Sequence, residues 1–134
     1  MKQKILLTLL LLMAVLLYAA TIRGIPGNPP GSLIKNNLDQ AAKPFELSPE
    51  RGRYILLLSL AENRSFALSK ELADAAYPNV GYHQGRYYIF FAPGISLLAW
   101  PLYTLGSQIN LGQVAAYSTI ALFGVLNIFV LYVS

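Results

Sequence analysis

The chain has 134 residues, of which 55% are hydrophobic and only 12% are charged, with a formal net charge of +4 and no cysteine. The absence of cysteine excludes disulfides and thiolate metal sites, and the positive surplus is too dilute to indicate a nucleic-acid partner. A soluble domain carries about a quarter charged residues, so this deficit favours a membrane protein.

The first predicted element is a membrane helix at the N-terminus. Residues 5–22 contain no ionisable group except tyrosine and would reach about 27 Å as a helix, close to the thickness of a bilayer core. Lys2 and Lys4 precede this run and favour a cytoplasmic N-terminus. We interpret residues 1–22 as an uncleaved signal-anchor helix. The alternative is a cleaved signal peptide with a mature N-terminus near Thr21.

Residues 23–86 form the polar part of the chain and hold eight of its ten basic residues and all six acids. We expect an extracytoplasmic loop, too small for a core of its own and held against the membrane by apolar stripes. Ser48 is a predicted N-cap for an amphipathic interfacial helix that begins at Pro49. Ser69 is a predicted N-cap for a second short helix over residues 70–76, which should end before Tyr77–Pro78.

The next segment combines turn signals with a second apolar stretch. Gly81 and Gly85 predict a tight turn, and residues 87–91 suit a short extended segment. Pro93 can open a helix that runs to Leu105. We predict a second membrane span over residues 87–105, kinked by its prolines.

The last predicted element is a third span over residues 111–133, another run without charge and about 35 Å long as a helix. The short link before it makes residues 87–134 a transmembrane hairpin. The predicted fold is therefore an all-α membrane protein with three transmembrane helices and a long outer loop that contains one or two short interfacial helices. Three crossings from a cytoplasmic start would leave Ser134 outside, in what we expect to be a bacterial or archaeal plasma membrane.

A few charged residues of the outer loop are candidates for chemistry. Glu50 could accept a proton from an incoming hydroxyl, although complementing the start of a helix is the simpler role. Arg53, Lys70 and Arg86 could bind a phosphate at the membrane surface, or could be solvated loop charges. The single histidine, His83, has no partner at metal-site spacing, so no metal site is predicted and no cofactor is expected.

The order of these pieces resembles a known family. The segments ERGRY at 50–54, ENRSFALSKELADAAYPNVGYHQGRYY at 62–88 and FAPGISLLAWPLYTLG at 91–106 follow a signal anchor in that order. This pattern resembles the N-terminal region of the polytopic GT-C glycosyltransferases, nearest to the family 39-like group that includes protein O-mannosyltransferases and aminoarabinose transferases. Where that family has an Asp-Glu pair, this chain has Glu50 and Arg51.

The resemblance implies transfer of a sugar from a polyprenyl-phosphate donor to an acceptor hydroxyl at the outer membrane face. It implies that Glu50 is the base and that Arg53 and Arg86 are the nearest matches to the residues that bind the lipid phosphate. Full members have many more spans, so we expect the N-terminal part of such an enzyme or a truncated relative, too short to act alone. The resemblance leaves a divalent metal open.

A different hypothesis is a small non-enzymatic membrane protein that packs with other transmembrane helices. Its support is the set of small residues along the third predicted span, where they would allow close helix contacts. These residues are Gly112, Ala115, Ala116, Ser118 and Gly124.

Overall fold

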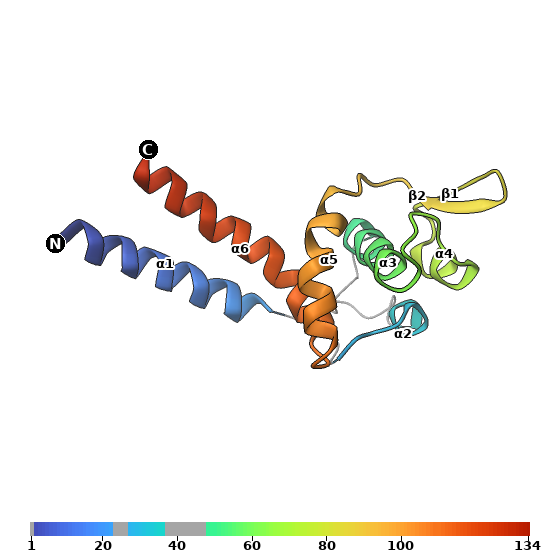
Figure 1. Ribbon diagram of the computed structural model, residues 1–134, viewed down its shortest axis with the longest axis horizontal. Helices are drawn as coiled ribbons and strands as arrows, with labels where there is room; N and C mark the ends of the chain where they lie inside the picture. The colour runs from blue at the N-terminus through green and yellow to red at the C-terminus, as the bar shows by residue number, and fades with distance from the viewer. Residues whose placement is uncertain (1, 23–26, 37–47) are drawn as a thin grey trace.

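The computed structural model describes residues 2–22, 27–36 and 48–134, and most of these residues are helical. Within these ranges the chain forms two long outer helices and a smaller folded unit between them in sequence (Figure 1). The elements are α1 (Lys2–Thr21), α2 (Gly31–Asn36), α3 (Ser48–Asn63), α4 (Lys70–Ala76), β1 (Val80–His83), β2 (Arg86–Ile89), α5 (Gly94–Ser107) and α6 (Gly112–Val133). We call α2 to α5, with the β1–β2 hairpin, the head.

Helix α3 is the centre of the head and is covered on several sides. Figure 1 shows it nearly end-on, with α5 on one side, α4 on the other and α2 below. Every residue from Tyr54 to Leu60 is buried, so two full turns of the helix have no exposed face. This corrects the prediction of an interfacial helix with one apolar stripe. The head builds a core because α5, which we expected in the membrane, packs on α3 instead.

Helix α5 does not have the form of the predicted second span. The first residues of the predicted segment, 87–89, lie in β2, and α5 itself has 14 residues, which is about 21 Å. Ala99 and Tyr103 of α5 are buried in the core of the head. In the described part of the chain, one helix is both long and apolar enough to cross a membrane, residues 112–132 of α6. The three predicted crossings are therefore not confirmed.

The prediction for α4 is confirmed, whereas the predicted turn and extended segment form a β-hairpin that the all-α prediction did not include: Gly81 lies in β1, and the second strand covers residues 86–89 instead of 87–91. The Ser69 side chain accepts a hydrogen bond of 3.3 Å from the amide of Leu72, and α4 ends at Ala76. The strands pair antiparallel through a two-residue turn at Gln84–Gly85, where both φ angles are positive (47° and 80°). Such a turn matches the twist of the strands and favours glycine at its second position.

Helices α1 and α6 form an antiparallel pair. The Tyr18 hydroxyl lies against the backbone of Gly124, and the Thr21 hydroxyl is hydrogen-bonded to that of Tyr117. As residue numbers fall along α1 they rise along α6, and both chain ends lie at the same end of the molecule (Figure 1). The head lies at the other end.

A short segment after α1 fastens this pair to the head. The side-chain amide of Asn28 donates to the carbonyl of Ser107 (2.9 Å), and its oxygen accepts from the amide of Gly112 (2.8 Å). Asn28 therefore joins the end of α5 to the start of α6. Helix α2 follows directly and was not predicted; its Ile34 is only 1% exposed in the core of the head.

Candidate functional site

The first two turns of α3 carry the candidate base and one candidate phosphate ligand. Glu50 is exposed and Arg53 is half-buried. Residues three apart in a helix are neighbours on one face, so the carboxylate and the guanidinium rise from the same patch of surface. We call these two residues the α3 patch.

The neighbouring cation, Arg51, has a different role from the one its position suggests. It points into the head, is 6% exposed, and donates a hydrogen bond of 2.9 Å to the carbonyl of Tyr77 at the end of α4. Burial lowers the pKa of its guanidinium. Arg51 therefore fixes the start of α3 against α4. At this position the chain has a buried structural cation.

Arg53 is held in place by two elements that follow the hairpin. Its guanidinium lies 5.5 Å from the ring centre of Phe91, and its backbone carbonyl accepts a hydrogen bond of 2.8 Å from Ser96 of α5. The residue before it must be small, because a Cβ on Gly52 would lie 2.9 Å from the Phe91 ring. The α3 patch thus sits where α3, the end of β2 and the start of α5 meet.

Lys70 and Arg86 do not join this patch. Arg86 begins β2, while the Phe91 ring beneath Arg53 follows its end, so about 16 Å of extended chain separates the two positions. Lys70 begins α4, at the end opposite Tyr77 and Arg51. Both are exposed. The sequence therefore predicted a single phosphate-binding set, whereas the structure divides it between two ends of the hairpin.

The single histidine of the sequence, His83, lies in the β1–β2 hairpin. His83 is exposed and lies opposite Arg86 in the hairpin register. Across the described ranges, no group of three or more His, Asp or Glu side chains could hold a metal ion.

A buried pair of tyrosines inside the head was not predicted from the sequence. The Tyr54 and Tyr103 rings meet edge to face at 6.1 Å between centres, and they join α3 to α5. Burial raises the pKa of the Tyr54 phenol, and nearby Tyr103 and Glu62 raise it further. No local signal could have shown this pair, because its members are 49 positions apart in sequence.

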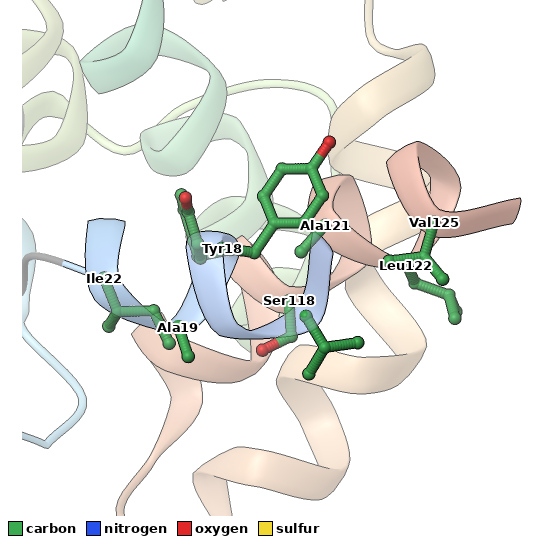
Figure 2. Close-up of a pocket in the computed structure, with 9 residues that line it drawn as sticks. Tyr18, Ala19, Ile22, Ser118, Ala121, Leu122 and Val125 are labelled. Atoms are coloured by element: carbon green, nitrogen blue, oxygen red, sulfur yellow. The ribbon is translucent and has the colours of Figure 1, made fainter. Parts of the chain in front are cut away.

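A groove between α1 and α6 is a second concave feature, with a volume of about 290 Å³. Figure 2 shows side chains from both sides of it, among them Ala19 of α1, Ile22 just after α1, and Ala121 and Leu122 of α6. Its lining is almost entirely apolar. The groove supplies no acid, base or cation for catalysis.

The small residues of α6 are largely used inside the chain. Ala115 packs against Gly106 of α5, Gly112 lies beside Tyr103 and Asn28, and Gly124 receives Tyr18. Each allows a close approach that a larger side chain would block. What α6 leaves exposed is a set of large apolar side chains: Ile120, Leu122, Phe123, Leu126, Phe129, Val130 and Leu131.

No protein-family model, no curated protein and no solved structure matches this chain. The class that the structure itself defines is a mostly helical protein with, among its described residues, one helix that could cross a membrane.

Proposed function

We propose that this chain is the N-terminal part, or a truncated relative, of a polytopic membrane glycosyltransferase. Such an enzyme moves a sugar from a polyprenyl-phosphate donor to an acceptor hydroxyl at the outer face of the membrane. The observation that carries the proposal is the α3 patch, in which Glu50 and Arg53 are neighbours on a helix that the head holds rigidly.

The two side chains of the α3 patch have complementary tasks in this reaction. The Glu50 carboxylate accepts the proton of the acceptor hydroxyl while its oxygen attacks the anomeric carbon of the donor sugar. The bond from that carbon to the phosphate oxygen breaks, and the phosphate leaves with the electron pair. Arg53 stabilises the charge on the leaving phosphate. A phosphate is weakly basic, so its departure needs no second carboxyl group as proton donor.

The arrangement of the outer helices supports a particular orientation. We place α1 and α6 across a bacterial or archaeal plasma membrane as an antiparallel pair, with both chain ends in the cytoplasm and the head outside. The apolar stretch of α1, residues 5–21, is about 26 Å long and ends where the head begins. This orientation brings the α3 patch to the side where the donor sugar would be transferred.

The test separates chemistry from binding with two variants of the longest protein that contains this chain, reconstituted in lipid nanodiscs. Turnover is measured with a polyprenyl-phosphate hexose and an acceptor peptide or glycan, and donor binding is measured separately. Glu50→Gln should reduce turnover at least about 100-fold with unchanged donor binding. Arg53→Gln should weaken donor binding about tenfold. If Glu50→Gln turns over at the original rate, Glu50 is not the base.

A second candidate function is a non-enzymatic membrane protein that packs with partner helices. The exposed apolar side chains of α6 favour it, although the small residues on which the sequence argument relied are occupied within the chain. Photo-crosslinking from Leu126 in native membranes would distinguish the two. Capture of one defined membrane protein, together with no donor binding by the purified chain, would favour the partner-helix function.

A further inference from the structure

The β1–β2 hairpin has two faces of different character. Val80, Tyr87 and Ile89 pack against the core of the head. Because side chains alternate along a strand, the opposite face carries Gly81 and His83 of β1 and Arg86 and Tyr88 of β2. Phe90 continues this alternation just past the end of β2. We call His83, Arg86, Tyr88 and Phe90 the hairpin outer face.

The aromatic part of this face is flat and open. The Phe90 ring is 70% exposed and lies over Gly81, where a Cβ would be 2.8 Å from the ring. Tyr88 is directly opposite Gly81 in the register. Because Gly81 has no side chain, the Phe90 ring can lie on strand β1 beside Tyr88. An exposed ring held in this way suits stacking on a ligand, since little freedom remains to be lost on binding.

The charged part of the face is purely basic. His83 and Arg86 are paired across the strands beside the turn, and the sequence contains no acid after Asp74. Lys70 lies close by, because Leu68 bridges to Tyr87, but it has Asp74 one helical turn away. The positive charge of the outer face therefore comes from Arg86.

The hairpin is fixed to the head and does not swing freely. The amide of Leu68 donates to the carbonyl of Tyr87 (2.9 Å), and the amide of Phe90 donates to the carbonyl of Asn79 (3.2 Å). The Tyr82 and Tyr87 rings are also in contact on the other face, 4.9 Å between centres. The first of these contacts holds the hairpin against the head, and the other two join its strands to each other.

We propose that the hairpin outer face binds an anionic carbohydrate. The C–H face of a sugar ring packs on Phe90 and Tyr88, and a carboxylate of the same or the next sugar is bound by the Arg86 guanidinium, which can hold it through two hydrogen bonds. Figure 1 places the hairpin at the end of the molecule opposite both termini. The choice of a carbohydrate over the membrane surface rests on the orientation proposed above, because that orientation directs the hairpin away from lipid.

The test measures binding of hyaluronan hexasaccharide to the full chain in nanodiscs of neutral lipid, by calorimetry. Neutral chitohexaose is the control ligand. Arg86→Gln and Phe90→Ala should each weaken hyaluronan binding about tenfold or more. Arg64→Gln removes the same charge from another exposed arginine of the head and should leave binding unchanged. Equal binding of the neutral and acidic sugars, or equal effects of Arg86→Gln and Arg64→Gln, would overturn the proposal.

A second measurement distinguishes this site from contact with the bilayer. Paramagnetic lipid in the nanodisc should leave the NMR signals of residues 80–90 unaffected. Broadening of those signals would show that the hairpin lies on the membrane and would overturn the carbohydrate site. Neither measurement requires sugar transfer, so loss of the transferase function and loss of this site are separate outcomes.

Discussion

At the scale of single residues, Arg51 and Arg53 show how two similar side chains in one helical turn acquire different roles. Arg51 is enclosed and bonded to the end of α4, whereas Arg53 lies over an aromatic ring at the surface. A buried hydrogen bond from a charged group stabilises a fold only while both partners are present. Removing the Arg51 side chain would leave the carbonyl without this donor and would leave a cavity in the head.

This difference predicts unequal effects on stability. Arg51→Ala should lower the free energy of unfolding by about 2 kcal/mol, because it removes a charge-assisted hydrogen bond to a carbonyl of the head. Arg53→Ala should lower it by about 0.5 kcal/mol, the scale of an exposed cation–π contact. Thermal unfolding of both variants in the same detergent measures the difference. A larger loss in Arg53→Ala would contradict the assignment of Arg51 as the structural cation.

Glu62, at the end of α3, predicts a pH dependence. Partial burial raises the pKa of its carboxyl above the ordinary value of 4.5, and Glu71 raises it further. The folded state then holds this proton more tightly than the unfolded state. Its contribution to stability is therefore full below pH 4.5 and is lost as the pH rises through the raised pKa.

The expected result is that Glu62→Gln flattens the fall in unfolding free energy above pH 4.5 and that Glu71→Gln reduces it. Asp74→Asn makes the same change in charge at an exposed position of α4 and is the matched control. Melting temperatures measured from pH 4 to pH 8 test whether the Glu62 carboxyl causes this loss of stability. A profile of Glu62→Gln parallel to that of the unmodified chain would exclude this carboxyl as the cause.

At the scale of elements, the sequence predicted the features that depend on neighbouring residues. It did not predict which elements pack against each other. Ser69 predicted the start of α4 because a capping hydroxyl and the amides it serves are within three residues of each other. The burial of α3 could not be predicted in this way. Its second covering surface is α5, more than 30 residues later, whose apolar composition suited lipid and protein equally well.

The candidate site also has one part that local sequence predicts and another part that depends on tertiary contacts. The pairing of Glu50 with Arg53 follows from helical spacing alone, so the sequence was sufficient for it. The separation of Arg86 from Arg53 depends on which end of β2 meets α3, and that is a tertiary contact. The proximity of Lys70 to Arg86 likewise depends on the bridge from Leu68 to Tyr87.

The packing of α1 on α6 depends on a glycine at position 124, which lets the Tyr18 ring approach closely. A Cβ at residue 124 would overlap the hydroxyl and ring of Tyr18, so Gly124→Ala should separate the helices or turn the ring away. The expected cost is about 1–3 kcal/mol, the range for overpacking. Tyr18→Ala in the same chain should restore much of the lost stability. Additive losses in the double variant would show that these residues are not in contact.

At the scale of the whole molecule, the number of crossings is the feature with the widest consequences. Three crossings would put the two chain ends on opposite sides of the membrane, whereas the proposed pair of crossings by α1 and α6 would put them on the same side, as both ends lie at one end of the molecule (Figure 1). We therefore expect single cysteines introduced at Gln3 and Ser134 to share one accessibility in oriented cells, and a cysteine at Gln84 to show the other.

Labelling with an impermeant maleimide before and after lysis measures this directly, and the natural chain is a clean background because it has no cysteine. Labelling of residue 134 from outside intact cells, with residue 3 protected, would support three crossings. A cysteine at Gln84 should then still label from outside. The experiment therefore tests whether α5 crosses the membrane separately from the side of the membrane on which the head lies.

The bonds of Asn28 couple the two parts of the protein mechanically. Because one amide side chain joins the segment after α1 to both sides of the α5–α6 corner, the head cannot pivot on a free hinge. In the proposed membrane orientation, a change in the tilt of the two outer helices, such as that imposed by a thinner bilayer, would be transmitted to the head as a rigid rotation. Bilayer thickness would in this way set the height of Glu50 above the lipid.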